Sequence, residues 1–483
     1  MFIERTKLKD KLPAYHVFEC LGENFVFDTS QCRFYKIDQL TADFLALALQ
    51  NSISVTIAIL QKSGRYSDAE ITSVGKEVKF LSKAGLFESI GSYFSNIASD
   101  YVWQAELGES IMEIQLAVSE KCNLACKYCY CPPSDDLPNN GMMPTNVAKA
   151  SIDLLFAQKT VKPWITFFGG EPLLNKPLIY NCIDYSKACA KRLGKSIGYS
   201  ITTNATLLDD KIMDCIVNDN FGLMISIDGP RDIHDKQCPT KSGSGSFDIA
   251  AQNASALMKR RTVGVRATVT HPIPDLAKLI DFFVDFGFNK VAIGLADNRN
   301  ENATPLDCNE TDRRKYIEYV KQILPTFVAS LSKGKEPIFF PLDQPLKKVA
   351  TGQMFAKPPV HNCGAGVAIV GVDITGRLYP CAKFIGMPMW TIGNAENGIN
   401  ANKQKEMFEC FLACIAPHCG ICWAYPVCGG PCLWACAKDD GTFEFNDGFC
   451  NFKKAMAEYA AYVGDQVQEY CGYGAEGPNL HEC

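Results

Sequence analysis

The placement of cysteine constrains this chain more than any other sequence feature. The chain has 483 residues and 23 cysteines, of which four lie between Cys122 and Cys131 and ten between Cys363 and Cys450. The N-terminus has no apolar signal-peptide core, so we expect a cytoplasmic protein. Thiols stay reduced in that compartment, and a disulfide framework is not expected there. Two groups of soft thiolate ligands instead predict metal binding.

The composition is that of a globular protein and argues against two classes of partner. Hydrophobic residues make up 47% and charged residues 21% of the chain, which is ordinary for a chain that buries large cores. The 48 Lys and Arg are outnumbered by 53 Asp and Glu, so no nucleic-acid partner is expected. No apolar run reaches the roughly 20 residues of a membrane span, and no membrane partner is expected either.

The first unit, residues 1–105, combines short strands with helices. Strands are expected at Tyr15–Asp28 and Cys32–Asp38, and helices at Thr41–Gln50, Val55–Lys62 and Asp68–Ala84, the last after a cap at Ser67. This order predicts a winged-helix-like domain. Its helices carry few basic residues, so it is better suited to binding an extended peptide by strand addition than to binding DNA.

The second unit, residues 106–335, alternates strands and helices. Strands are expected at Glu113–Ser119, Trp164–Gly170, Ile197–Thr203, Gly222–Asp228, Val263–Thr270 and Lys290–Leu295, with amphipathic helices such as Pro177–Leu193 between them. This pattern predicts the α/β class with a parallel sheet, and six units predict a partial (β/α)6 barrel. Chemistry is then expected on the loops that follow the strands.

The first cysteine group follows the first barrel strand. Cys122, Cys126 and Cys129 form a CxxxCxxC loop. Three thiolates can hold three irons of a 4Fe–4S cubane and leave the fourth iron open. The alternative is a zinc site that takes Cys131 as its fourth ligand.

This loop resembles the signature of the radical S-adenosylmethionine (SAM) enzymes, and later segments resemble further motifs of that family. Gly169-Gly170-Glu171-Pro172 follows the second strand, Thr202-Thr203-Asn204-Ala205-Thr206 the third, and Ser226-Ile227-Asp228-Gly229-Pro230 the fourth. The resemblance implies a barrel that binds SAM and one 4Fe–4S cluster.

The same resemblance implies roles for single residues. Tyr128 would lie near the adenine, and Gly169, Gly170 and Glu171 would receive the amino group of the methionine moiety. Arg266 in the fifth strand would clamp the carboxylate, and Asn204 and Asp228 would line the same site; such polar residues at strand ends also often serve packing. One departure is that no arginine follows His234-Asp235 within Lys236–Pro239, where relatives often carry one.

The third unit, residues 336–452, resembles a SPASM domain. Residues 453–483 are expected to form a C-terminal helix and tail. The cysteines of the third unit are spaced as in a SPASM domain. The alternative interpretation of the same cysteines is a zinc ribbon. By resemblance Cys419, Cys422, Cys428 and Cys450 hold an outer auxiliary 4Fe–4S cluster, and Cys363, Cys381 and Cys432 hold an inner one. The inner cluster lacks a fourth ligand, so either Cys308, Cys410, Cys414 or Cys436 completes it, or an open iron binds a substrate thiolate.

Together these units resemble the radical SAM/SPASM maturases of small proteins and peptides. The layout looks most like thioether-forming members, such as maturases of the small subunit of quinohemoprotein amine dehydrogenase. That resemblance implies SAM, three 4Fe–4S clusters, a peptide bound through residues 1–105, and an electron donor such as flavodoxin or ferredoxin. A thiol also needs a base, because its free pKa of about 8.5 leaves little thiolate at neutral pH. Asp235 is the candidate, with a structural capping carboxylate as the alternative.

Other functions stay open at this point. An anaerobic sulfatase-type maturase would make formylglycine, and another peptide maturase would form carbon–carbon bonds or decarboxylate its substrate. An iron–sulfur electron carrier or redox sensor would explain the cysteines but not the motifs around Glu171 and Arg266.

Overall fold

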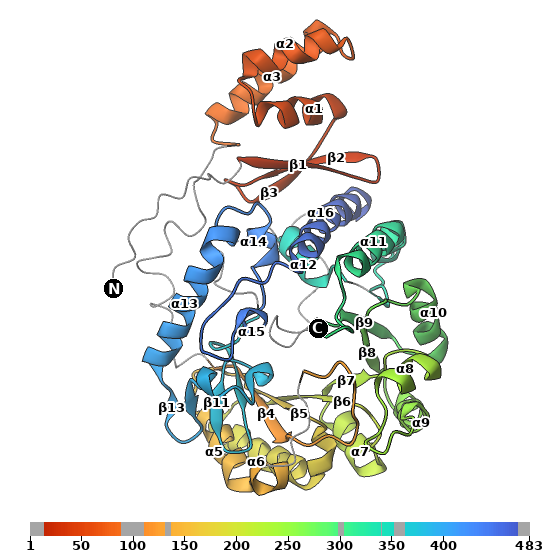
Figure 1. Ribbon diagram of the computed structural model, residues 1–483, viewed down its shortest axis with the longest axis vertical. Helices are drawn as coiled ribbons and strands as arrows, with labels where there is room; N and C mark the ends of the chain where they lie inside the picture. Colours follow the sequence, from red (N-terminus) through yellow and green to blue (C-terminus); the bar gives the residue numbers. More distant parts are fainter. Residues whose placement is uncertain are drawn as a thin grey trace.

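The computed structural model describes residues 14–87, 111–130, 137–297, 304–339, 341–351 and 363–471 (Figure 1). They form a ten-stranded mixed sheet with the order β13-β12-β11-β10-β4-β5-β6-β7-β8-β9, and a three-stranded antiparallel sheet, β1-β2-β3. None of the helices described combines the length and apolar composition needed to cross a bilayer. The predicted boundary at residues 105 and 106 lies outside the described residues.

Six parallel strands build the partial barrel that the sequence predicts. They are β4 (Glu113–Ser119), β5 (Trp164–Gly169), β6 (Gly198–Thr203), β7 (Gly222–Ser226), β8 (Gly264–Val269) and β9 (Lys290–Leu295). The helices on their outer side are α5 (Thr145–Phe156), α6 (Lys176–Leu193), α7 (Asp210–Asn218), α8 (Arg231–Gln237), α9 (Phe247–Met258), α10 (Leu276–Phe286) and α11 (Glu310–Leu331). The predicted fold class is confirmed.

The two faces of this sheet differ in burial. Side chains alternate across a strand, and Ile114 and Ile165 are fully buried on the helix side. Their neighbours Gln115 and Thr166 face the other way and are only half-buried, and Arg266 on β8 is exposed. The core therefore lies between the sheet and the helices. The concave face is left accessible, unlike the filled interior of a closed eight-stranded barrel.

The cysteine-rich region extends the barrel sheet. Strand β10 (Ile369–Val372) pairs in parallel with β4, and β11 (Arg377–Tyr379), β12 (Gly393–Asn394) and β13 (Gly398–Ile399) continue the sheet in antiparallel order. The helices are α12 (Asp343–Thr351), α13 (Ala401–Cys419), α14 (Tyr425–Cys428), α15 (Leu433–Cys436) and α16 (Cys450–Cys471).

This region is more regular than its sequence led us to expect. No helix is predicted from the sequence between residues 400 and 420, yet α13 is 19 residues long. Phe408, Phe411 and Ile415 follow helical spacing and are buried in the same apolar cluster as the barrel core. The region therefore shares one core with the barrel.

The N-terminal unit has strands followed by helices, as predicted, but the segment expected as a strand at Tyr15–Asp28 is divided into two strands by a turn at Leu21 and Gly22. Strands β1 (Tyr15–Cys20), β2 (Glu23–Asp28) and β3 (Arg33–Ile37) precede α1 (Gln39–Ala48), α2 (Ile53–Ser63) and α3 (Asp68–Lys83). Ser67 caps α3 as predicted and forms a capping box with Glu70.

The small sheet lies between its own helices and the C-terminal region (Figure 1). The His16 ring on β1 stacks on Trp423 with 3.9 Å between ring centroids. The His16 Nε2 atom lies 2.8 Å from Glu458 Oε1 on α16. Gln466 of α16 also donates a hydrogen bond to Glu23 on β2. These contacts fix the unit against the region that carries the second cysteine group.

Candidate active site

The CxxxCxxC loop leaves the C-terminal end of β4, where the fold places chemistry. Cys122 is half-buried and Cys129 is exposed. Burial raises the pKa of Cys122 to about 11, and the Cys129 thiol is close enough to add to that shift. Cys126 forms a disulfide with Cys238, which was not predicted from the sequence. The loop holds the three thiols a cubane needs, but Cys126 could ligate iron only after this disulfide opens.

Two glycines hold this loop against the end of β5. The Gly170 amide donates to Ser119 O and the Glu171 amide to Lys121 O, both at 2.9 Å. A Cβ atom on Gly169 would lie 1.9 Å from Ser119 O, and one on Gly170 would lie 2.5 Å from Lys121 O. No side chain fits at those separations. The two backbones can therefore approach this closely only because both residues are glycine.

Glu171 is a buried carboxylate held by neutral donors. Its side chain accepts hydrogen bonds from the Thr203 hydroxyl at 2.7 Å, the Asn204 amide at 2.9 Å and the Leu173 amide at 3.0 Å. The residue is 1% exposed, and burial raises its pKa to about 6. A buried charge of this kind is stabilised by a cationic partner. The site therefore fits the ammonium group of SAM.

Asn204 ties the end of β6 to the cysteine loop. Its Nδ2 atom donates to Asn123 Oδ1 at 3.0 Å, and Asn123 in turn donates to the Thr206 hydroxyl at 2.8 Å. Asn123 was not singled out from the sequence, because a single asparagine between two cysteines carries no separate signal.

The side chain of Tyr128, in the cysteine loop, contacts the side chain of Asp228, which follows β7. The Tyr128 hydroxyl donates to Asp228 Oδ2 at 2.9 Å, and the Thr268 amide donates to Asp228 Oδ1 at 2.9 Å. Burial raises the pKa of Asp228 to about 6. Burial and the neighbouring Asp228 charge hold the pKa of Tyr128 well above its usual value. The structure thus brings together residues that are 100 positions apart in the sequence.

Arg266 lies on the accessible face of β8. It is exposed although it sits in an inner strand of the sheet, and its guanidinium lies over Gly294 on β9, 3.1 Å from where a Cβ atom would stand. Among the described residues, no carboxylate forms an ion pair with it. An uncompensated guanidinium on this face suits a carboxylate ligand.

Asp235 has contacts that account for it structurally. Its Oδ1 atom accepts hydrogen bonds from the backbone amides of Ser246 and Phe247, both at 2.8 Å. Amides at the start of a helix have no acceptor within that helix. Asp235 of α8 supplies one and therefore caps the neighbouring helix α9. The capping alternative accounts for the residue without any part in proton transfer.

We expect Asp235→Ala to lower the free energy of unfolding by roughly 1 kcal/mol, the usual cost of a lost helix cap. Chemical denaturation of the variant measures this. Asp235→Asn keeps one acceptor and should recover most of the loss. A variant as stable as the parent chain would contradict the capping role, and a stable variant that cleaves SAM but forms no product would restore Asp235 as the base.

Several thiols of the second cysteine group influence one another's pKa. Burial raises the pKa of Cys381 to about 12, and the neighbouring Cys432 and Cys363 thiols contribute to the shift. Burial raises the pKa of Cys450 to about 11, with contributions from Cys428 and Cys422. Cys419 is likewise affected by burial and then by those same outer thiols. After burial, the pKa values of Cys381, Cys450 and Cys419 are therefore raised by cysteines of the same predicted set.

Neither set has the geometry of a single-metal site. Within the described ranges, no three Cys, His, Asp or Glu side chains surround one point that could hold a metal ion. A zinc site needs four ligands around one ion, whereas each cysteine of a cubane binds a different iron. The proposed donor sets consist of cysteine thiols alone, which is the ligand type of iron–sulfur clusters.

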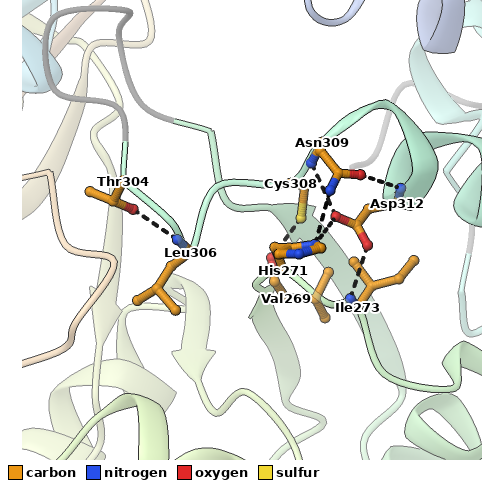
Figure 2. A network of polar contacts seen from close by, with 8 residues as sticks. All are labelled: Val269, His271, Ile273, Thr304, Leu306, Cys308, Asn309 and Asp312. Carbon is orange, nitrogen blue, oxygen red and sulfur yellow. Dashed lines mark hydrogen bonds and ion pairs between the residues drawn. The ribbon is translucent and has the colours of Figure 1, made fainter.

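Cys308 lies beside Val269 and His271 in a network of polar contacts (Figure 2). It is buried, its Sγ atom lies 3.3 Å from Val269 O, and burial raises its pKa to about 12. Around it, the His271 ring contacts Asp312 Oδ2 at 2.7 Å, and Asn309 caps α11. This network closes the end of β8 against α11, so Cys308 has a packing role.

The other three candidates lie in the cysteine-rich region. Cys436 is fully buried, and its raised pKa reflects burial first and then the nearby thiols of Cys414, Cys432 and Cys450. Cys410 is exposed on α13. Cys436 is therefore the candidate for which the structure shows a neighbouring inner-set thiol.

A bridge of side chains joins the two cysteine groups. The Lys383 ammonium lies 4.5 Å from the ring centroid of Trp434 and 5.3 Å from that of Tyr130. Tyr130 directly follows Cys129. The Ala382 amide, next to Cys381, donates to Gln115 on the concave face of β4 at 2.9 Å. The inner set and the CxxxCxxC loop therefore border the same face of the barrel.

Comparison with known proteins agrees with this arrangement. A family model of the radical SAM superfamily matches residues 116–259. An uncharacterized protein of Methanocaldococcus jannaschii, MJ0907, is 30% identical over 47% of this chain and 76% of its own length. The chain belongs to the radical SAM superfamily.

The chain is also similar to two named enzymes. The cysteine-type anaerobic sulfatase-maturating enzyme of Clostridium perfringens is 22% identical over 71% of this chain and 94% of its own length. The mycofactocin maturase MftC of Mycobacterium tuberculosis is 26% identical over 65% of this chain and 76% of its own length. Both of these similar proteins are maturases by name.

A solved structure shares the fold. The structure of anSMEcpe with bound AdoMet and Kp18Cys peptide superposes with a TM-score of 0.60 at 19% identity. It covers 74% of this chain and 99% of that chain. About a quarter of this chain has no counterpart there.

Proposed function

We propose that this chain is a radical SAM maturase that forms thioether bonds between cysteine and side-chain carbons of a small protein or peptide. Cys122, Cys126 and Cys129 would hold the SAM-binding 4Fe–4S cluster, with Cys126 free of its disulfide. Cys419, Cys422, Cys428 and Cys450 would hold the outer auxiliary cluster, and Cys363, Cys381 and Cys432 the inner one. When bound, SAM and its cluster supply the 5′-deoxyadenosyl radical that removes hydrogen from a substrate carbon.

The observation that carries this proposal is the position of the inner thiol set. It contains three cysteines, and the contacts of Lys383 and Gln115 place it at the same face as the CxxxCxxC loop. Of the candidates for a fourth ligand, Cys308 packs elsewhere, whereas Cys436 neighbours the inner-set thiol of Cys432 and is the alternative to an open position. A fourth position open to a substrate thiol would lower the pKa of that thiol, next to the face where hydrogen is removed.

The chain's own residues would orient SAM from several strands. Glu171 would accept the ammonium group, since it is a buried carboxylate with neutral partners. Arg266 would bind the carboxylate through its unpaired guanidinium. The glycines at 169 and 170 would let the methionine moiety approach the backbone, and Tyr128, Asn204 and Asp228 would position the cysteine loop against it.

The N-terminal sheet is the proposed peptide-binding unit. In the described residues, β3 pairs with β2 along one edge and with no strand along the other. An extended peptide could add to that edge through backbone hydrogen bonds. The contacts of His16 with Trp423 and Glu458 support this role, since they hold the sheet beside the second cysteine group.

Product analysis tests the proposal. The full-length chain, loaded with iron and sulfide, would be incubated under reducing anaerobic conditions with SAM and a short cysteine-containing peptide. A thioether replaces one C–H and one S–H bond with a C–S bond. The product should therefore lose two hydrogen atoms, keep its sulfur and resist thiol alkylation. An alkylatable product of unchanged mass would contradict the proposal.

Formylglycine formation is the second candidate function, favoured by the similarity to the sulfatase-maturating enzyme. The same experiment separates the two, because conversion of cysteine to formylglycine removes the sulfur and creates an aldehyde. A peptide of the Kp18Cys type is the substrate that tests this second function. Conversion of that peptide to an aldehyde would favour formylglycine formation over the thioether.

We expect Arg266→Ala to raise the KM for SAM by roughly 10- to 100-fold, because a hydrogen bond to a charged group contributes about 1.5–3 kcal/mol. Initial rates of 5′-deoxyadenosine formation across a range of SAM concentrations measure the effect. Arg266→Lys should recover part of it. Arg314→Ala, on the exposed face of α11, is the control and should leave KM unchanged. An unchanged KM in Arg266→Ala would exclude the clamp.

A further inference from the structure

The segment that follows α8 runs antiparallel to the CxxxCxxC loop. The Ala125 amide donates to Pro239 O at 2.8 Å, and the Lys127 amide donates to Gln237 O at 2.9 Å. Leu124 and Thr240 form an antiparallel bridge. Three successive backbone contacts therefore fix the register of the two segments.

That register sets Cys126 directly opposite Cys238. The pair lies between the bonded partners 125 with 239 and 127 with 237, the position at which facing Cα atoms approach most closely in an antiparallel ladder. The two Cα atoms are 4.0 Å apart and the side chains are joined as a disulfide. The pairing thus follows from the backbone arrangement as well as from the sulfur positions.

Cys238 is also enclosed by residues of the proposed cofactor site. It is 3% exposed. Its Sγ atom lies 3.3 Å from the Tyr128 hydroxyl and 3.4 Å from Asp228 Oδ2. Cys238 is therefore a buried cysteine beside the cluster loop that is not one of the three proposed ligands, and it is bonded to one of them, Cys126.

We propose that Cys126 and Cys238 form a reversible disulfide that controls whether iron can enter the SAM-binding site. In the oxidised form Cys126 is bonded to Cys238, and the loop offers two thiols instead of three. In the reduced form all three loop cysteines are available. This inference rests on the proposed ligand role of Cys126.

The chemistry of the switch is thiol–disulfide exchange. The thiols of Cys126 and Cys238 are oxidised by a low-molecular-weight disulfide, which is reduced to two thiols in the same exchange. A dithiol reductant reverses the reaction and is itself oxidised to a disulfide. No iron or SAM takes part in either direction, so the switch operates on the cluster-free chain.

The first measurement is peptide mapping of the full-length chain after its iron has been removed by chelation. Trypsin releases residues 122–127 and 237–241 as separate peptides, because lysines stand at 121, 127, 236 and 241. After treatment with glutathione disulfide we expect these two peptides to appear linked without reductant and separate after dithiothreitol. Failure to find the linked pair would overturn the proposal.

The second measurement is cluster loading. Oxidised chain given iron and sulfide without a thiol should bind about four fewer irons, one cubane, at the SAM-binding site than dithiol-treated chain. When its remaining clusters are reduced for the measurement, the chain that was loaded in the disulfide form should correspondingly lack the electron paramagnetic resonance signal that changes on SAM addition. Cys238→Ser should load that site equally with and without oxidant. Cys215→Ser, in α7 away from the loop, is the control and should stay oxidant-sensitive.

Cys238→Ala provides a second variant if the serine chain does not fold, and the peptide map needs no variant at all. Equal oxidant sensitivity in Cys238→Ser and in the parent chain would overturn the switch alone. If Cys126→Ala keeps the SAM-responsive signal, the ligand role of Cys126 fails and the switch fails with it. The two failures are therefore distinguishable.

Discussion

Replacing Cys122, Cys126 and Cys129 together with alanine is expected to abolish SAM cleavage while iron remains bound elsewhere in the chain. The three thiols are the proposed ligands at the end of β4. Cys381 and Cys450 belong to the two proposed auxiliary sets, which the change leaves intact. We expect 5′-deoxyadenosine formation under anaerobic reduction to fall by more than about 10³-fold, equivalent to at least ~4 kcal/mol of lost transition-state stabilisation. Chromatography of the nucleoside measures it.

The control for this triple variant is Cys308→Ser. Cys308 is also a buried thiol near the barrel mouth, but it packs against Val269 outside both auxiliary sets (Figure 2). That variant should keep its full iron content and its rate of SAM cleavage. Loss of all iron from the triple variant, or retained cleavage in it, would contradict the assignment of these three cysteines to a separate cluster.

Gly170→Ala should produce the second largest effect, by displacing the cysteine loop. Its Cβ atom would lie 2.5 Å from Lys121 O and 2.9 Å from the Cys122 amide nitrogen, which are backbone atoms that cannot rotate away. The loop must therefore shift, and the Glu171–Lys121 hydrogen bond shifts with it. We expect SAM cleavage to fall by more than about 100-fold, since a misplacement of about 1 Å can cost that much.

Gly264→Ala is the matched control, because an added Cβ atom on that strand residue would meet only ordinary contacts, the nearest at 3.6 Å. It should cleave SAM at nearly the parent rate. Circular dichroism of both variants should show the same helix content, which separates a local displacement from misfolding. Normal SAM cleavage by Gly170→Ala would mean that the close packing of β5 on the cysteine loop is not needed.

The features that follow local patterns were predictable from the sequence. The six barrel strands alternate or run apolar over five to seven residues, and their order behind the CxxxCxxC loop is enough to predict the parallel sheet. Ser67 and Glu70 carry the capping box within four residues. The grouping of Cys381 with Cys363 and Cys432 follows from spacing that resembles a known domain, and the structure places these thiols near one another.

Features that depend on contacts between distant segments could not be predicted from local sequence patterns. The pairing of Cys126 with Cys238 joins residues 112 positions apart and depends on how the chain leaves α8. The capping of α9 by Asp235 depends on the same turn, so its carboxylate was equally consistent with a base. The parallel pairing of β10 with β4 joins segments more than 250 residues apart, and no local pattern marks it.

The central claim is that SAM cleavage by this chain joins a substrate sulfur to a substrate carbon. The most direct test is tandem mass spectrometry of the peptide product, recorded beside the amount of 5′-deoxyadenosine formed. We predict a product that lacks two hydrogen atoms, retains its sulfur, carries no alkylatable thiol at the modified cysteine and shows fragments joined at that residue. A product that has lost sulfur, or an unchanged peptide despite SAM cleavage, would contradict the claim.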